Sequence, residues 1–259
     1  MPSLARLDYE IHYTLEGPEG APLLVLSNSL GADLGMWNAQ VEEFKRSFRV
    51  LRYDNRGHGQ SNAPKAPYKI EDVANDAAAL ITHLGKVAAH FCGLSLGGMV
   101  GMWLATYKPK LINKLVLCNT AALLGPRETW ETRIAAVRQD GMQAVVQAVM
   151  ERWFTEGFRK RSPEQVARIE QAFLQCSVEG YTGCGAAIRD MDQRGTIAGI
   201  KSPTMVIAGT HDPSTPPALG QFIAETIPGG RYVELPAAHM SNIEAAAPFN
   251  DVVASFLSM

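Results

Sequence analysis

Residues 93–97, Gly-Leu-Ser-Leu-Gly, constrain the fold of this chain more than any other segment. They stand between an apolar run at residues 87–92 and a helix-like stretch at residues 98–105. A serine hydroxyl attacks carbonyl carbons when a sharp strand-to-helix turn exposes it and backbone N–H groups lie nearby to receive the oxyanion. Flanking glycines permit such a tight turn. We therefore predict that Ser95 is a nucleophile at the junction of a strand and a helix.

The order of residues downstream strengthens this interpretation. By itself the pattern G-x-S-x-G is weak evidence in a chain with 23 glycines, and Ser95 could simply cap a core helix. The flanking glycines, however, are unnecessary for capping. In α/β hydrolases the nucleophile is followed in the chain by an acid and then by a histidine. Asp212 and His239 follow in this order, each just after an apolar strand-like run, at residues 204–208 and 231–235.

Proton chemistry assigns the roles of these two residues. The serine needs a base that accepts and returns a proton near neutral pH, which favours His239. A carboxylate on the other ring nitrogen fixes the tautomer and stabilises the imidazolium, and Asp212 lies where such an orienting acid is expected. Two alternatives stay open: Asp212 forms an Asx turn in a proline-rich surface loop, and His239 is a surface histidine before a helix.

Two further loops are expected near the nucleophile. One oxyanion donor is the N–H of Leu96, and a second comes from the loop after an early strand. The sequence Asn-Ser-Leu-Gly follows such a strand, and we choose the N–H of its Leu30. Residues 53–61 are close to the pattern D-x-R-G-x-G-x-S, which is common in α/β hydrolases. Asp54 precedes the nucleophile and is out of triad order, so we interpret it as part of a structural turn supported by Arg56.

Composition excludes several classes of function. A chain of 259 residues, 46% of them hydrophobic, can bury one large core. Its 24 basic and 26 acidic residues give a net charge of −2, which does not favour a nucleic-acid partner. The four cysteines show no C-x-x-C spacing, and no run has the length of a membrane span or the form of a signal peptide. We expect a soluble cytoplasmic protein with reduced thiols, without membrane partners and without a metal site.

Short apolar runs alternate with segments of helical period, which predicts an α/β fold with a mostly parallel sheet flanked by helices. The expected strands are residues 23–27, 49–53, 88–92, 114–119, 204–208 and 232–235, and the expected helices are residues 36–46, 70–84, 96–107, 217–227 and 243–257. Alternating polarity over residues 5–15, followed by turn residues at 17–20, predicts an antiparallel edge hairpin.

Residues 121–196 break the alternation, because they contain only helical periods. We predict that they form a helical cap inserted into an α/β-hydrolase core, which comprises residues 1–120 and 197–259. A cap inserted after a strand would lie over the carboxyl ends of the sheet, where ligands bind in open α/β folds.

Several segments together resemble the 3-oxoadipate enol-lactonases, which are α/β hydrolases of the β-ketoadipate pathway of aromatic degradation. The resemblance runs essentially from end to end, and its main segments are residues 26–31, 36–37, 53–59, 93–98, 117–122 and 130–138. Residues 28–31 are the most telling, because most α/β hydrolases have His-Gly where this chain has Asn28 and Ser29.

The resemblance implies hydrolysis of the enol-lactone to 3-oxoadipate through an acyl-enzyme. The implied partner is a small lactone that bears a carboxylate, and no metal or organic cofactor is required. On the predicted cap, Arg133 is favoured as the carboxylate contact, since a guanidinium can bind a carboxylate bidentately, and Trp130 as a second substrate contact. An exposed Arg133 and a Trp130 that packs the cap against the core are the alternatives. The oligomeric state stays open.

The triad alone cannot choose among substrates, because one fold and one set of catalytic groups serve several reactions. A carboxylesterase or perhydrolase is one alternative, and a carbon–carbon bond hydrolase that opens ring-fission products is another. A non-catalytic ligand-binding protein on the same fold is the alternative from a different class.

Overall fold

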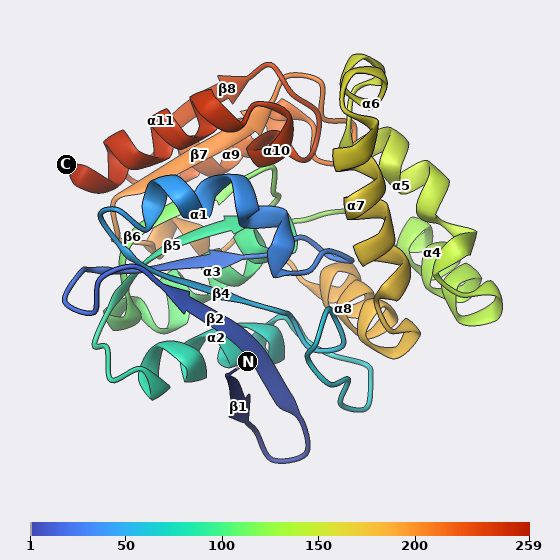
Figure 1. Cartoon of the computed structure of the whole chain (residues 1–259), viewed down its shortest axis with the longest axis horizontal. Helices are drawn as coiled ribbons and strands as arrows, with labels where there is room; N and C mark the ends of the chain where they lie inside the picture. Colours follow the sequence, from blue (N-terminus) through green and yellow to red (C-terminus); the bar gives the residue numbers. More distant parts are fainter. Residues whose placement is uncertain (1) are drawn as a thin grey trace.

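Eight strands form one sheet in the order β1-β2-β4-β3-β5-β6-β7-β8 in the computed structural model, which describes residues 2–259 (Figure 1). The strands are β1 (Ser3–Ala5), β2 (Glu10–Glu16), β3 (Leu23–Ser27), β4 (Arg49–Tyr53), β5 (Ala89–Leu94), β6 (Ile112–Cys118), β7 (Thr204–Gly209) and β8 (Arg231–Leu235). Strands β3 to β8 are parallel to one another, whereas β2 pairs antiparallel with β1 and β4. This mostly parallel sheet confirms the predicted α/β class.

Strands β3 and β7, whose carboxyl ends lead into loops of the candidate site, are buried on both faces. Every residue of β3 and of β7 is buried, because helices cover the sheet on its two sides. Such strands form continuous apolar runs rather than alternating ones, which is why they stand out in the sequence. The edge strand β8 buries only Leu235, and its remaining residues are partly or fully exposed.

Helices pack on both faces of the sheet, and Figure 1 shows α1 and α11 on the face opposite α2. The helices outside the insertion are α1 (Asn38–Phe44), α2 (Ile70–His83), α3 (Leu96–Tyr107), α9 (Pro217–Thr226), α10 (Ser241–Glu244) and α11 (Ala246–Ser258), with short 3₁₀ turns η1 (Leu34–Trp37), η2 (Pro109–Leu111) and η4 (Ile197–Gly199). The prediction of a single helix at residues 243–257 is wrong in one respect, because the chain forms two helices that are separated at Ala245. Pro248 has no N–H to donate to the carbonyl of Glu244, so a new helix begins instead.

The antiparallel edge is present, but its turn is not at residues 17–20. Strands β1 and β2 form the hairpin, and the N–H of Arg6 donates to the carbonyl of Tyr9 at 2.8 Å to close it. Residues 17–20 instead connect β2 to β3. A Cβ on Gly17 would lie 2.2 Å from the carbonyl oxygen of Phe48, so glycine is needed where this connection crosses the chain before β4.

Five helices lie between β6 and β7, and Figure 1 shows them gathered at one side of the sheet. They are α4 (Arg127–Asp140), α5 (Val146–Trp153), α6 (Glu156–Arg161), α7 (Pro163–Gln175) and α8 (Val178–Asp190), with the 3₁₀ turn η3 (Met142–Ala144) between α4 and α5. The start of α8 contacts the loop after β4 so closely that a Cβ on Gly180 would lie 2.4 Å from the Cα of Gly57. No helix within residues 2–259 has the length and apolar character needed to cross a membrane.

Candidate active site

Ser95 lies in the turn that joins β5 to α3, with backbone dihedral angles of φ 56° and ψ −112°. A residue with a side chain rarely adopts this conformation, and holding it costs roughly 1–3 kcal/mol. The neighbouring glycines are required by close packing. A Cβ on Gly93 would lie 2.2 Å from the carbonyl oxygen of Gly97, and a Cβ on Gly97 would lie 2.2 Å from that of Ser27. Within the described chain the Ser95 side chain makes no capping hydrogen bond, so the simple N-cap interpretation is wrong.

His239 and Asp212 form a buried pair, in which Nδ1 of His239 lies 2.8 Å from Oδ2 of Asp212. The two residues follow β8 and β7, adjacent parallel strands whose carboxyl ends meet at one edge of the sheet. Only 2% of His239 and 3% of Asp212 is exposed, so neither is a solvated surface residue. With its Nδ1–H donating to the carboxylate, the neutral imidazole keeps Nε2 as its basic nitrogen.

Both oxygens of Asp212 accept several hydrogen bonds. Oδ1 accepts from the backbone N–H groups of Ser214, at 2.8 Å, and Thr215, at 3.0 Å, which is the Asx turn considered as an alternative. Oδ2 accepts from the Thr215 hydroxyl at 2.6 Å as well as from His239. Burial raises the pKa of Asp212, but the charge of His239 and these side-chain hydrogen bonds outweigh it and lower the pKa below its usual value. Asp212 is therefore an ionised carboxylate held in one orientation.

Asn119 also supports the pair of Asp212 and His239, and sequence reasoning missed it. It directly follows β6 and has φ 44°, in the left-handed region that asparagine tolerates better than most residues. Its Nδ2 donates to Oδ2 of Asp212 at 3.0 Å and to the carbonyl of Ala238 at 3.2 Å, while its Oδ1 accepts from the Ser241 hydroxyl at 2.5 Å. The only signal in the sequence is a polar residue at the carboxyl end of a buried strand.

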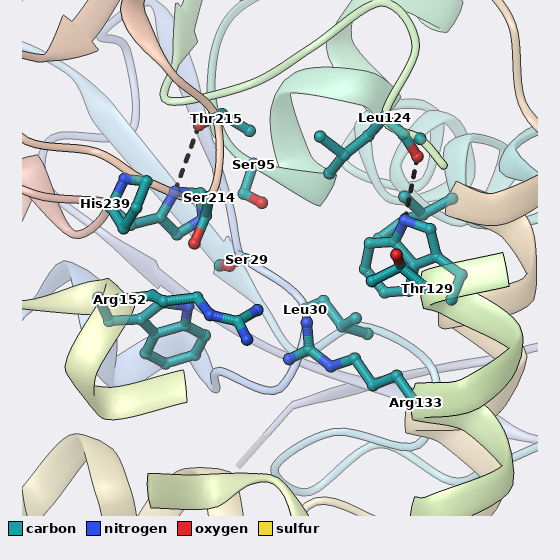
Figure 2. Close-up of a pocket in the computed structure, with 15 residues that line it drawn as sticks. Ser29, Leu30, Ser95, Leu124, Thr129, Arg133, Arg152, Ser214, Thr215 and His239 are labelled. Carbon is teal, nitrogen blue, oxygen red and sulfur yellow. Dashed lines mark hydrogen bonds between the residues drawn. The ribbon is translucent and has the colours of Figure 1, made fainter. Parts of the chain in front are cut away.

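Ser95 and His239 line one cavity of about 200 Å³ (Figure 2). In the described part of the chain no hydrogen bond joins the Ser95 hydroxyl to His239, whose Nδ1 contacts Asp212 and Thr215. Catalytic hydrogen bonds are often long in the absence of a substrate and tighten in the complex. The indole of Trp153, from α5, stacks beside the imidazole at 6.4 Å between ring centroids, so the inserted helices cover His239.

The loop after β3 contains Leu30, whose N–H is the second oxyanion donor predicted from the sequence. Among residues 2–259, neither the N–H of Leu30 nor that of Leu96 has a hydrogen-bond acceptor, which leaves both free to receive an oxyanion. His58 anchors this loop: its Nε2 accepts from the N–H of Gly31 at 2.8 Å, and its Nδ1 donates to the carbonyl of Arg56 at 3.0 Å. Burial lowers the pKa of His58 and so favours the neutral form that can accept. No sequence pattern assigned this role to His58.

Asp54 belongs to a structural loop, and Arg56 contacts α2 rather than the Asp54 carboxylate. The carboxylate of Asp54 accepts from Nδ1 of His12 at 2.8 Å and from the N–H of Leu34 at 2.7 Å. The Nε of Arg56 instead donates to Asp76, on α2, at 2.8 Å. The guanidinium of Arg56 therefore ties the loop to α2, and within the loop the carbonyl of Arg56 accepts a hydrogen bond from His58.

Helices α4 and α5 supply the wall of the cavity opposite the sheet. Trp130 and Arg133 both line it, as the resemblance implies. The indole N–H of Trp130 donates to the carbonyl of Leu124 at 3.0 Å, and the half-buried guanidinium of Arg133 lies 5.3 Å from the Trp130 ring centroid and 5.5 Å from that of Tyr181. A second arginine, Arg152, lines the same cavity from α5. Sequence reasoning did not single it out, because the insertion holds many basic residues at no distinctive spacing.

Known proteins match this chain over its whole length. The family model described as the alpha/beta hydrolase fold matches residues 22–246. The 3-oxoadipate enol-lactonase 2 of Acinetobacter baylyi is 40% identical, over 97% of this chain and 94% of that protein, and enol-lactonase 1 of the same organism is 33% identical, over 94% and 91%. The crystal structure of the enol-lactonase from Burkholderia xenovorans is 46% identical and covers 100% of both chains with a TM-score of 0.98. This chain is therefore an α/β hydrolase that belongs to the family of the 3-oxoadipate enol-lactonases.

Proposed function

We propose that this protein hydrolyses 3-oxoadipate enol-lactone to 3-oxoadipate in the degradation of aromatic compounds. Ser95 is the nucleophile, His239 the general base and acid, and Asp212 the orienting carboxylate. The observation that carries the proposal is the cavity, which Ser95 and His239 line together with the cation of Arg133. The similarity to named enol-lactonases over the full chain supports the choice of lactone.

Acylation begins when the Ser95 hydroxyl oxygen attacks the lactone carbonyl and Nε2 of His239 takes its proton. The N–H groups of Leu30 and Leu96 stabilise the oxyanion of the tetrahedral intermediate. Collapse of this intermediate breaks the ring bond between the acyl carbon and the enol oxygen. The leaving enolate is stabilised by resonance, so ring opening is easier than loss of an ordinary alkoxide. The imidazolium of His239 gives its proton to the leaving group, which becomes a ketone, and His239 is neutral again.

Deacylation uses the same groups in reverse. A water molecule gives a proton to His239 and attacks the acyl carbon, and the Ser95 oxygen leaves and recovers a proton from the imidazolium. The ionised Asp212 stabilises that imidazolium in both halves of the cycle. One water is consumed, the lactone carbonyl becomes a carboxylate, and a proton is released at neutral pH.

The inserted helices provide the substrate contacts in this proposal. Arg133 binds the side-chain carboxylate of the lactone, and the Trp130 indole packs against its ring. We assign residues 121–196 to a cap and residues 1–120 and 197–259 to the catalytic core. The cytoplasm is the compartment that we propose, since all four cysteines are free thiols.

A comparison of three substrates tests the proposal. The purified protein is given freshly generated 3-oxoadipate enol-lactone, a neutral nitrophenyl ester and a ring-fission dienone, and lactone loss is followed together with proton release. We expect the lactone to have by far the highest kcat/KM. Efficient ester cleavage without lactone turnover would assign the protein to the carboxylesterases, dienone cleavage alone to the carbon–carbon bond hydrolases, and binding without turnover to ligand-binding proteins.

A further inference from the structure

Two arginines converge on the cavity from different helices. Figure 2 shows the guanidinium groups of Arg133, from α4, and Arg152, from α5, directed toward each other below Leu30. Both residues line the Ser95 cavity, and both also line a second cavity of about 450 Å³ between α4 and α5. Because they border both spaces, the two cations lie at the boundary between the active site and a hollow on the side of the inserted helices.

Neither cation has a carboxylate partner. Within residues 2–259 no Asp or Glu oxygen lies within 4.0 Å of either guanidinium. The nearby Arg127, by contrast, pairs with Glu131 and Asp190. The Nε of Arg133 is also buried without a hydrogen-bond partner among the described residues. A buried donor without an acceptor is unfavourable. The burial of Nε also closes it to a ligand, so an anion in the cavity would bind the terminal nitrogens of the guanidinium.

The surroundings hold the Arg133 cation in place despite the neighbouring positive charge. Its guanidinium lies over the rings of Trp130 and Tyr181, whose faces attract a cation. Two guanidinium groups directed at one another repel, and this repulsion is relieved when a carboxylate bridges them with charge-assisted hydrogen bonds. The arrangement is therefore one that an anionic ligand completes.

We propose that Arg152 and Arg133 form a carboxylate clamp, and that the cavity binds linear dicarboxylates as analogues of its product. The clamp takes one carboxylate, while the other lies beside Ser95 and the N–H groups of Leu30 and Leu96. This orientation rests on the proposed lactone hydrolysis, in which the reaction leaves a new carboxylate at Ser95 and keeps the original one at the arginines. Occupancy of both ends makes binding depend on chain length, since the ligand must span a fixed distance.

Calorimetric titration of the purified protein with glutarate, adipate, pimelate and the neutral adipamide tests the clamp. We expect adipate, whose chain length equals that of 3-oxoadipate, to bind more tightly than the other dicarboxylates and adipamide not to bind measurably. Arg152→Gln should weaken adipate binding about tenfold or more, the loss expected when a charge-assisted hydrogen bond is removed. Arg152→Lys should recover only part of the loss, because an ammonium lacks the planar fork of a guanidinium. Arg138→Gln, an exposed position of α4 outside this cavity, is the matched control and should leave the affinity unchanged.

The outcomes separate this inference from the proposed function. An adipate affinity that is the same in Arg152→Gln as in the wild type, or adipamide binding as tight as adipate binding, would overturn the clamp even if the lactone is hydrolysed rapidly. Adipate binding that depends on Arg152 supports the clamp even if the lactone is not a substrate, because the titration involves no turnover. Arg152 is exposed, so its substitution does not open the core, and circular dichroism of each variant verifies folding.

Discussion

The amide of Asn119 donates a hydrogen bond to Oδ2 of Asp212 at 3.0 Å, across the carboxyl ends of two adjacent strands. The same amide group donates to the carbonyl of Ala238, the residue before His239. Asn119 therefore joins the acid to the loop that carries the base. Its effect on the reaction is indirect, because it contacts the acid and not the substrate.

Removal of this amide should lower the turnover rate more than it changes substrate affinity. We expect Asn119→Gly, which tolerates φ 44°, to reduce kcat about tenfold with little change in KM. The lost hydrogen bond to a charged group should also lower the free energy of unfolding by roughly 1.5–3 kcal/mol. Steady-state kinetics and urea unfolding measure the two effects, and an unchanged kcat would remove Asn119 from the supporting network.

Substitution of the nucleophile should separate activity from stability. Both Ser95→Ala and Ser95→Gly should lower kcat by roughly 10⁴-fold or more. At most positions a glycine variant is less stable than the alanine variant, but the φ of 56° at Ser95 reverses this order. The free energy of unfolding of Ser95→Gly should therefore exceed that of Ser95→Ala by about 1 kcal/mol. Chemical denaturation of the two variants checks this order, and residual turnover in both would point to a different nucleophile.

Asp212 should stabilise the fold only above acidic pH. The pKa of its carboxyl is lowered in the folded protein, so the unfolded chain binds the proton more readily as the pH falls below about 4. The contribution is therefore present above the unfolded pKa and is lost as the pH falls through the folded one. The difference in unfolding free energy between wild type and Asp212→Asn should shrink over this window. A difference that stays constant down to pH values well below about 4 would contradict the lowered pKa.

His58 should hold the loop that carries Leu30 in place, and it can do so only while its imidazole is neutral and accepts from the Gly31 N–H. Loss of the acceptor for the Gly31 N–H in His58→Ala should lower kcat about tenfold, whereas His58→Gln, which keeps an acceptor, should recover most of the activity. Because the folded pKa of His58 is lowered by burial, the wild type loses stability as the pH falls below about 6.5, and His58→Gln should not lose this part. Identical kinetics of His58→Ala and His58→Gln would show that the acceptor does not matter.

Arg133 should select for the carboxylate of the substrate. We expect Arg133→Ala to lower kcat/KM for the enol-lactone roughly 10- to 100-fold, the effect of one lost charge-assisted contact, and to affect a neutral ester far less. The ratio of the two losses is the informative quantity, with Arg138→Ala on the same helix as the control. Equal losses on both substrates would place the anion contact elsewhere.

Local signals were sufficient for a large part of the structure. Buried parallel strands such as β3 and β7 are continuous apolar runs, and the glycines around Ser95 indicate a tight turn. The positions of these strands and the turn that carries Ser95 could therefore be predicted. Chain order then selected Asp212 and His239, which the structure brings into one hydrogen-bonded pair. The break at Ala245 does not show in the apolar periodicity, which continues from α10 into α11, and it depends instead on the missing N–H of Pro248.

The sequence by itself determined the sheet, the inserted helices and the three residues of the candidate triad, because each depends on a short pattern or on order along the chain. Only the tertiary structure decided which side chains join them: Asn119 beside Asp212, His58 beside the loop that carries Leu30, and Arg152 across the cavity from Arg133. These residues come from loops and helices that are far apart in the chain and meet only after folding. A contact between two such side chains depends on relative positions in space, which no spacing within a single segment encodes.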